Sequence, residues 1–200
     1  MIDTVEELRR LYAQPSDRAV RKQLSRLDRH CRRFIELSPF VVMASGRGEH
    51  LDASPRGGAP GFVEIIDDVT LRIPDATGNN RLDSLENIVT SGQVGLLFLI
   101  PGVDETLRVN GAARLFAGQD QASKVVVEIT VREAFLHCAK ALMRSRLWSD
   151  QARQDRSMLP SINQMLAEQT GAGGSVESQE EMVERYRKTL ELEKARKARK

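Results

Sequence analysis

Residues 94–111 read VGLLFLIPGVDETLRVNG, two strand-like segments joined by a turn. Val94–Ile100 is an apolar run, and after Pro101 the pattern becomes alternating. Leu107 and Val109 fall on one side, while the polar residues fall on the other: Thr106, Arg108, Asn110 and Arg114. Consecutive side chains of a strand point to opposite faces of a sheet. The stretch therefore predicts two strands, the second with one core face and one polar, partly cationic face.

Similar short runs lie on both sides of this stretch, separated by turn residues: Phe40–Ala44, Phe62–Ile66, Thr70–Pro74 and Lys124–Val131. One helix interrupts them. Asn79 or Asn80 is expected to cap it, and Gly92 to end it. Its apolar stripe is Leu82, Leu85, Ile88 and Val89. Many short strands with one inserted helix predict a closed or nearly closed antiparallel barrel, which we assign to residues 39–150.

Helical extensions are expected at both ends, residues 1–38 and 151–200. Thr4–Glu7 fits a capping box at the start of a first helix. A second helix is expected to begin at Ser16 or Asp17, with an apolar stripe that continues to Ile35. Cys31 lies on this stripe and is expected in the core. Phe135–Trp148 is expected to be a basic helix or helical loop. Leu159–Glu168 is expected to form a short helix. Residues 177–200 are expected to form a charged helix. Its basic end could bind a polyanion, but a solvent-exposed terminal helix is the preferred interpretation.

Composition excludes several classes of protein. A net charge of +2 gives no general attraction to polyanions, which argues against nucleic acid as a partner. Two cysteines cannot form a disulfide framework, and His137 with Cys138 lacks the further ligands of a metal site. No secretion signal and no apolar run long enough for a membrane is found, so a cytoplasmic location is expected.

Motifs for phosphate loops, dinucleotide folds, zinc proteases and nucleophile elbows are absent. If the protein is an enzyme, a cofactor is expected to carry its chemistry, and no catalytic residue can be assigned. Two segments suit a phosphate group. Arg56 is expected to project from a tight loop, Asp52–Gly58, and Arg81 lies in the expected first turn of the inserted helix, where backbone amides are free. An ordinary surface arginine remains the alternative at each position.

Seven segments occur in an order that resembles a known family. They are Ser54–Gly57, Leu71–Asp75 followed by Gly78–Ile88, Val94–Phe98 followed by Pro101–Gly111, Phe135–Leu142, and Arg144–Trp148. The resemblance extends over about residues 30–150. This region resembles the pyridoxamine 5′-phosphate oxidase superfamily, and within it a bacterial subgroup of oxidase-related proteins with no assigned substrate.

The resemblance implies a mainly β fold, a six-stranded antiparallel split barrel with one inserted helix, that dimerises and holds FMN at the interface of the homodimer. It places Arg56 and Arg81 on the flavin phosphate, with Asn79 and Asn80 beside them. Ile73, Pro74 and Asp75 would lie along the flavin, and Thr106 near the ring edge, with Arg108 on the same polar face. The late segment would reach a flavin, often that of the other subunit, through His137, Lys140, Arg144 and Trp148.

Two departures from the family pattern stand out. The final segment with Trp and Arg, which binds the vitamin phosphate in the oxidase proper, is missing, and this argues against pyridoxamine phosphate as the substrate. The link from Leu115 to Lys124 is also shorter than expected. The leading hypothesis is an FMN-dependent oxidoreductase that exchanges hydride with a small organic substrate, with NAD(P)H as a candidate partner. The alternatives are a non-catalytic protein that binds or stores flavin or deazaflavin, and an interaction protein that uses its basic terminal helix.

Overall fold

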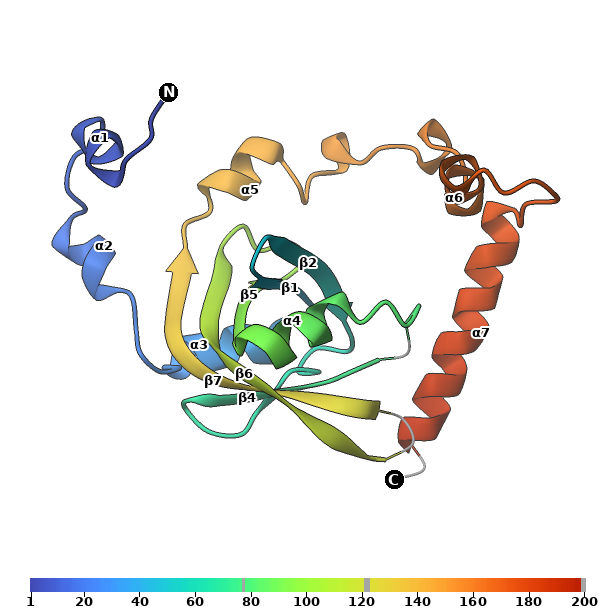
Figure 1. Cartoon of the computed structure of the whole chain (residues 1–200), viewed down its shortest axis with the longest axis horizontal. Coiled ribbons are helices and arrows are strands. Elements are labelled where there is room, and N and C mark those ends of the chain that lie inside the picture. The colour runs from blue at the N-terminus through green and yellow to red at the C-terminus, as the bar shows by residue number, and fades with distance from the viewer. Residues whose placement is uncertain (77, 121–122, 199–200) are drawn as a thin grey trace. The chain divides into compact units, whose positions relative to one another are not determined.

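The computed structural model describes residues 1–76, 78–120 and 123–198. The chain divides into two compact units, one of residues 1–119 and 123–148 and the other chiefly of residues 149–200. The first unit contains the sheet and its core (Figure 1). All of the residues proposed for a cofactor site belong to this unit.

A single antiparallel sheet forms the first unit, with its strands in the order β2-β1-β5-β6-β7-β4-β3. The strands are β1 Phe40–Arg47, β2 His50–Gly57, β3 Glu64–Ile65, β4 Thr70–Pro74, β5 Gln93–Leu99, β6 Thr106–Asp120 and β7 Ser123–His137. The expected mainly β class is confirmed. The ladder is open, with β2 and β3 at its ends, and it has seven strands where six are predicted.

The additional strand is β2, which pairs with β1 from Phe40↔Gly57 to Arg47↔His50. The sequence indicates a loop at Asp52–Gly58, and that prediction is wrong, since Arg56 lies within the strand. An edge strand has one neighbour and buries little, so β2 lacks an apolar face. Pro55 fits an edge strand because it can donate no hydrogen bond to a second neighbour.

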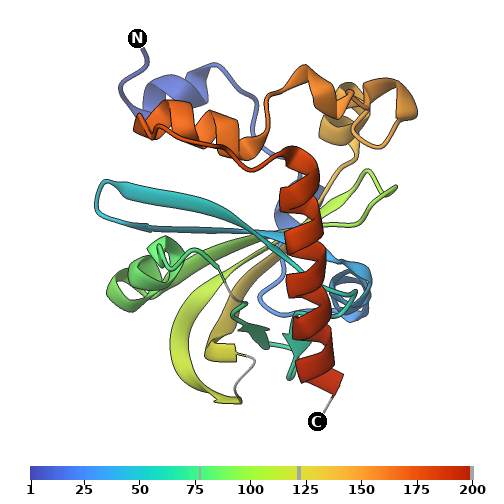
Figure 2. The ribbon, with the colours of Figure 1, turned by 90° about the vertical axis from the view of Figure 1, so that its right-hand side faces the viewer.

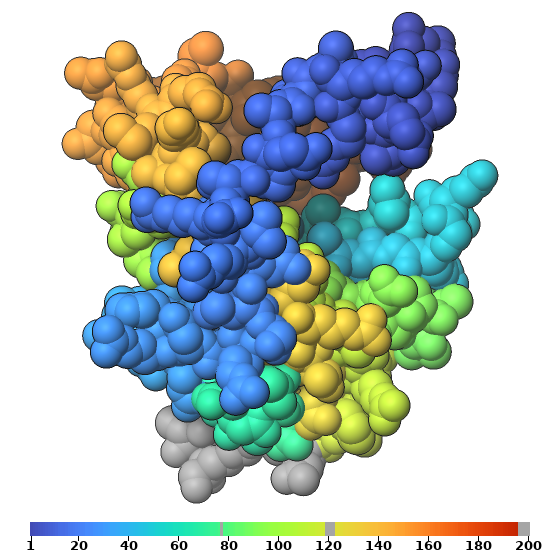
Figure 3. Space-filling view, turned by 90° about the vertical axis from the view of Figure 1, so that its left-hand side faces the viewer, coloured from blue at the N-terminus to red at the C-terminus, as the bar shows by residue number. Residues whose placement is uncertain are grey.

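The two longest strands, β6 and β7, have 15 residues each. Along β7 the partner changes: Val126–Thr130 pair with β4, whereas Ala134 pairs with Leu24 of the N-terminal segment. Figure 3 shows this segment, in blue, against β7, in yellow. Phe135–His137 therefore belong to a strand and not to the expected helix, which is limited to α5, Lys140–Ser145. Of the Leu115–Lys124 link, residues 121–122 lie outside the described residues.

The core follows the alternation in the sequence. Val94, Leu96 and Phe98 of β5 are buried, as are Leu107 and Val109 of β6. Two helices complete this core, α3 (Arg29–Leu37) through Cys31 and Ile35, and α4 (Asp83–Ser91) through Leu85 and Ile88. The opposite faces of β5 and β6 stay partly open.

The N-terminal region differs from expectation in its second helix. The capping box of α1 (Val5–Arg10) is present, and Ser16 caps α2 (Asp17–Arg21). The helix stops there because Leu24 pairs with Ala134, and Asp28 then caps α3 by accepting hydrogen bonds from the backbone N–H groups of His30 and Cys31. One predicted helix is thus two helices separated by a short strand-like bridge.

Residues 149–200 contain two short 3₁₀ helices, Asp150–Ala152 and Arg156–Met158, followed by α6 (Ile162–Thr170) and α7 (Gln179–Ala198). Gly171 ends α6 with a φ of 66°, a left-handed conformation that glycine adopts without steric cost. Within this unit Arg185 pairs with Glu177 at 2.8 Å. Among the helices that the structure describes, none is both long and apolar enough to cross a membrane.

Candidate functional site

A polar network joins β2 to the first turn of α4, in the region where Figure 2 shows the β1–β2 hairpin, in cyan, beside α4, in green. Arg56 donates a hydrogen bond from Nη2 to Ser84 Oγ at 3.0 Å. Ser84 Oγ donates in turn to Asp52 Oδ2 at 2.5 Å, and Ser54 Oγ donates to Asp52 Oδ1 at 2.8 Å. The network holds the Arg56 guanidinium at the start of a helix.

Asp75, just beyond β4, adds a carboxylate near this arginine. Partial burial raises the pKa of Asp75, while the positive charge of Arg56 opposes the rise. Its backbone N–H donates to Val125 O at 2.8 Å, which fixes the end of β4 beside β7. The structure therefore brings together two of the predicted site residues, Arg56 and Asp75, from distant parts of the chain.

The start of α4 is not as the sequence predicts. Leu82, with a φ of 57°, takes the N-cap position and gives no side-chain hydrogen bond to the helix, so Asn79 and Asn80 do not cap it. Asn79 Oδ1 instead accepts from the backbone N–H of Arg81, which lies before the helix and not in its first turn. The N-cap residue of α4 therefore supplies no side-chain acceptor for the first-turn amides, a condition that suits anion binding.

Arg81 is exposed and forms an ion pair with Asp83, Nε to Oδ2, at 2.8 Å. The hydrogen bond and the charge of Arg81 lower the pKa of Asp83. Asp83 therefore gives Arg81 a counter-charge from within the chain. An exposed pair of this kind contributes little free energy, so Arg81 can exchange partners readily.

A pocket of about 250 Å³ adjoins this network. It is lined by Arg47, His50, Leu51, Asp52, Arg81, Asp83 and Asn87. Arg47 forms an ion pair with Glu86 at 2.9 Å, yet its Nε is buried and has no hydrogen-bond partner among the described residues. A buried donor without a partner costs about 1–3 kcal/mol, which points to an absent ligand.

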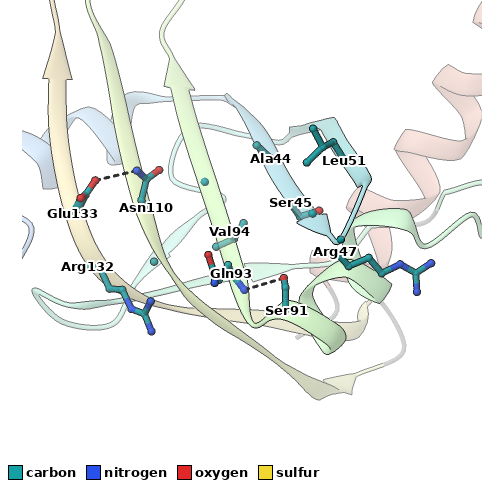
Figure 4. A pocket seen from close by; sticks show the side chains of 14 residues that line it. Ala44, Ser45, Arg47, Leu51, Ser91, Gln93, Val94, Asn110, Arg132 and Glu133 are labelled. Atoms are coloured by element: carbon teal, nitrogen blue, oxygen red, sulfur yellow. Dashed lines mark hydrogen bonds between the residues drawn. The ribbon is translucent and has the colours of Figure 1, made fainter. Parts of the chain in front are cut away.

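A larger cleft of about 690 Å³ lies across β1, β5, β6 and β7 (Figure 4). Arg47 stands at one end and Glu133 at the other. Between them the floor is made of small residues, among them Ala44, Gly95 and Gly111. A Cβ atom at Gly95 would lie 3.2 Å from Asn110 Oδ1. At Gly111 it would meet the Thr130 carbonyl of β7, so the glycine is required by the close approach of the strands.

At the Glu133 end the cleft borders a second group of predicted residues. Asn110 donates to Glu133 Oε2 at 3.0 Å, and Arg108 Nη2 lies 3.7 Å from the same oxygen. His137 packs edge-on against Phe135, with the ring centroids 5.0 Å apart. Burial, together with the positive charges of Arg108 and Lys22, lowers the pKa of His137, so its imidazole is neutral near pH 7.

The remaining predicted residues are spread out. Ile73 is buried in the core, so its side chain does not reach a site, whereas Pro74 is half-buried next to Asp75. Thr106 begins β6. Lys140 and Arg144 are exposed on α5, and Trp148 is held by a hydrogen bond from its indole N–H to Val103 O at 2.9 Å.

Several residues of the site are missed by the sequence analysis, notably Arg47, Ser84 and Glu133. Arg47 lies in a segment interpreted only as a hairpin corner. Ser84 belongs to a quoted motif but has no assigned role, although serine in the first turn of a helix is a common phosphate ligand. Within the described residues no group of His, Cys, Asp and Glu could hold a metal ion.

Comparison with solved structures finds similar proteins of low sequence identity. It is similar to HupZ of Group A Streptococcus (17% identity, 55% of this chain and 93% of that chain, TM-score 0.45). It is also similar to an FMN-binding protein of Syntrophomonas wolfei subsp. wolfei (10% identity, 54% of this chain and 88% of that chain, TM-score 0.40). A third similar structure is an FAD-binding protein of Mesorhizobium loti (11% identity, 58% of this chain and 97% of that chain, TM-score 0.37). No curated protein matches. The model of the pyridoxamine 5′-phosphate oxidase family matches residues 27–141, more than half of the chain, and the protein belongs to this family.

Proposed function

We propose that the protein is an FMN-dependent oxidoreductase that acts on a small organic substrate, with the flavin held at the interface of a homodimer. In this proposal the open, seven-stranded sheet is the family's split barrel with one added edge strand. The observation that carries the proposal is the meeting of Arg56, Ser84 and the uncapped start of α4 in a member of this family.

The donor set fits a flavin phosphate. Two guanidinium groups and the Ser84 hydroxyl lie at the start of α4, where Ser84 would turn its O–H from Asp52 to a bound phosphate. Arg47 adds a buried N–H that has no partner among the described residues. Guanidinium groups bind phosphate through paired hydrogen bonds, and a helix N-terminus adds a favourable dipole. Asp83 competes for Arg81, and Asp75 repels a phosphate, which Arg56 partly offsets. Arg56, Arg81 and Ser84 would hold the phosphate, with Asn79, Asn80 and Pro74 beside them.

The distribution of the remaining residues supports a dimer in this proposal. The face of the sheet that carries the larger cleft also carries half-buried apolar side chains, Val42, Leu97 and Leu99. Because one chain leaves this face uncovered, we propose that a second copy covers it. In that arrangement Lys140, Arg144 and Trp148 of one subunit would complete the flavin site of the other.

The bound flavin would supply two-electron chemistry, accepting or giving a hydride. The chain's own residues would position the flavin and shield it from water. Arg56 and Arg81 would anchor one end of the flavin, and the small floor residues Gly95 and Ala44 would leave room for a substrate or for NAD(P)H beside the bonded pair of Asn110 and Glu133. The free, exposed thiol of Cys138 is compatible with a reducing compartment such as the cytoplasm.

The proposal is tested by the absorption spectrum of the purified protein and by its size in solution. We expect flavin bands near about 370 and 450 nm, FMN released by heat, and a dimer. A colourless dimer that ignores FMN but binds a deazaflavin would change the cofactor. Bound flavin that no reductant or substrate turns over would favour a storage protein. A monomer that binds FMN tightly would contradict the interface site.

Replacing Asp83 by asparagine is expected to strengthen FMN binding. The change frees Arg81 from its ion pair and removes a negative charge from the phosphate site. Exposed ion pairs contribute about 0.2–1 kcal/mol, so the dissociation constant should fall by roughly 1.4- to fivefold. Flavin fluorescence titration measures it. In the Arg81→Ala background the same substitution should have a smaller effect, and an equal effect in both backgrounds would show that Arg81 is not involved.

A further inference from the structure

Three basic side chains converge on one aromatic ring beside the larger cleft. Lys22 Nζ lies 4.1 Å from the centroid of the Phe135 ring, and Arg108 Cζ lies 4.9 Å from it. The ring of His137 meets Phe135 edge-on at 5.0 Å. These residues come from three segments: the end of α2, strand β6 and strand β7. We call Lys22, Arg108, Phe135 and His137 the basic cluster.

The basic cluster has one carboxylate next to it, and that carboxylate is already occupied. Glu133 Oε1 accepts from Gln23 Nε2 at 2.9 Å, and Oε2 accepts from Asn110 Nδ2 at 3.0 Å. Arg108 approaches Oε2 only at 3.7 Å, beyond hydrogen-bond distance. Two cations therefore face one anion, and the local excess of charge is positive.

Arg108 shows directly that the cluster is incomplete. Its Nε is buried and has no hydrogen-bond partner among the described residues. In the register of the sheet Arg108 stands next to Leu97, so apolar surface flanks the guanidinium on that side. A partly buried cation among apolar groups is costly unless something pairs with it. Within the described residues Arg108 Nε thus has no acceptor, and Nη2 has Glu133 only at 3.7 Å.

The cluster lies where a substrate in the cleft would reach it. Asn110 and Glu133 line the larger cleft, and both contact the cluster side of the sheet. The α4 network borders the opposite end of the cleft, through Arg47. A molecule that carries an anionic group can therefore place it at the basic cluster without displacing a phosphate at α4.

We propose that Lys22, Arg108 and His137 form a subsite for an anionic group, a carboxylate or a phosphate, of the substrate. That the anion belongs to a substrate rests on the proposed flavin-dependent function, whereas the binding of an anion rests on the cluster alone. Arg108 would pair with the anion, Lys22 would add charge, and His137 would donate a hydrogen bond when protonated.

The protein has three histidines, which makes the test direct. The pKa of each is measured by NMR in chloride, in inorganic phosphate and in acetate at equal ionic strength, with and without FMN. His137 reports on the basic cluster, His50 lines the small pocket at α4, and His30 lies in neither. A bound anion offsets Arg108 and Lys22, so we expect the pKa of His137 to rise by about one pH unit, in FMN-loaded protein as well.

Matched variants identify the residues responsible. Arg108→Gln and Lys22→Gln should abolish the rise at His137, while Arg26→Gln, an equal loss of charge at an exposed site close by in the chain, should leave it intact. The proposal is overturned if His137 does not respond, or if all three histidines respond equally. A response of His50 alone would remove the subsite and leave the flavin site standing. A His137 response that disappears on FMN loading would assign the cluster to the cofactor and not to the substrate.

Discussion

Replacing Arg56 by alanine should weaken FMN binding by about 2–3 kcal/mol, roughly 30- to 140-fold in the dissociation constant. Arg56 is held by Ser84 at the start of α4, and its charge offsets the carboxylate of Asp75. The alanine variant loses the hydrogen bonds to the phosphate and leaves Asp75 facing an anion. Quenching of flavin fluorescence during titration measures the loss.

Two further variants separate this effect from a general loss of positive charge. Arg56→Lys keeps the charge but loses the paired hydrogen bonds of a guanidinium, so its affinity should fall between those of wild type and Arg56→Ala. Arg72 on β4 forms an exposed ion pair with Glu128 at 2.7 Å, and Arg72→Ala should leave the affinity for FMN unchanged. Wild-type affinity in a folded Arg56→Ala protein would remove Arg56 from the phosphate site.

Replacing Phe98 by alanine should lower the free energy of unfolding by about 3–5 kcal/mol, the usual cost of deleting a buried aromatic side chain. Phe98 is fully buried in β5, between Val41 of β1 and Leu107 of β6. Its strand also forms the floor of the cleft on the opposite face through Gly95. Urea denaturation followed by circular dichroism gives the value.

Phe116 supplies the control, because it lies on β6 with 48% of its surface exposed. Phe116→Ala should change the free energy of unfolding by less than about 0.5 kcal/mol. If Phe98→Ala proves too unstable to purify, Phe98→Leu keeps most of the volume and should lose about 1 kcal/mol. Equal losses at positions 98 and 116 would contradict this description of the core.

The sequence predicts well where burial imposes a simple period. In Thr106–Leu115 the alternation indicates which residues enter the core, and the structure confirms it for Leu107 and Val109. Val94–Ile100 is an apolar run, so its sequence predicts a strand but not which of its faces is buried. The alternation of apolar and polar residues does not predict β2, because this edge strand has one neighbour and no apolar face. The period also fails between α2 and α3, where a helical pattern is broken by pairing with the distant Ala134.

The candidate site is predictable only in part. Arg56 and Arg81 are found from their neighbours in sequence, but the partner of Arg56 is Ser84, 28 residues away. Leu82 in a left-handed conformation is also hidden, because a large apolar residue rarely adopts a positive φ. Ile73 is nominated by family resemblance and turns out to face the core, since its side chain falls on the buried side of β4.

Pro55 limits how two copies of this chain can assemble. A sheet grows across subunits when an exposed edge offers unbroken rows of amide and carbonyl groups, and proline interrupts such a row. With Pro55 in the middle of β2, and with β3 at the other edge only two residues long, neither margin supports a continuous intermolecular sheet. Contact between two copies is therefore expected through the faces of the sheet. The interrupted edges also disfavour aggregation by addition of strands.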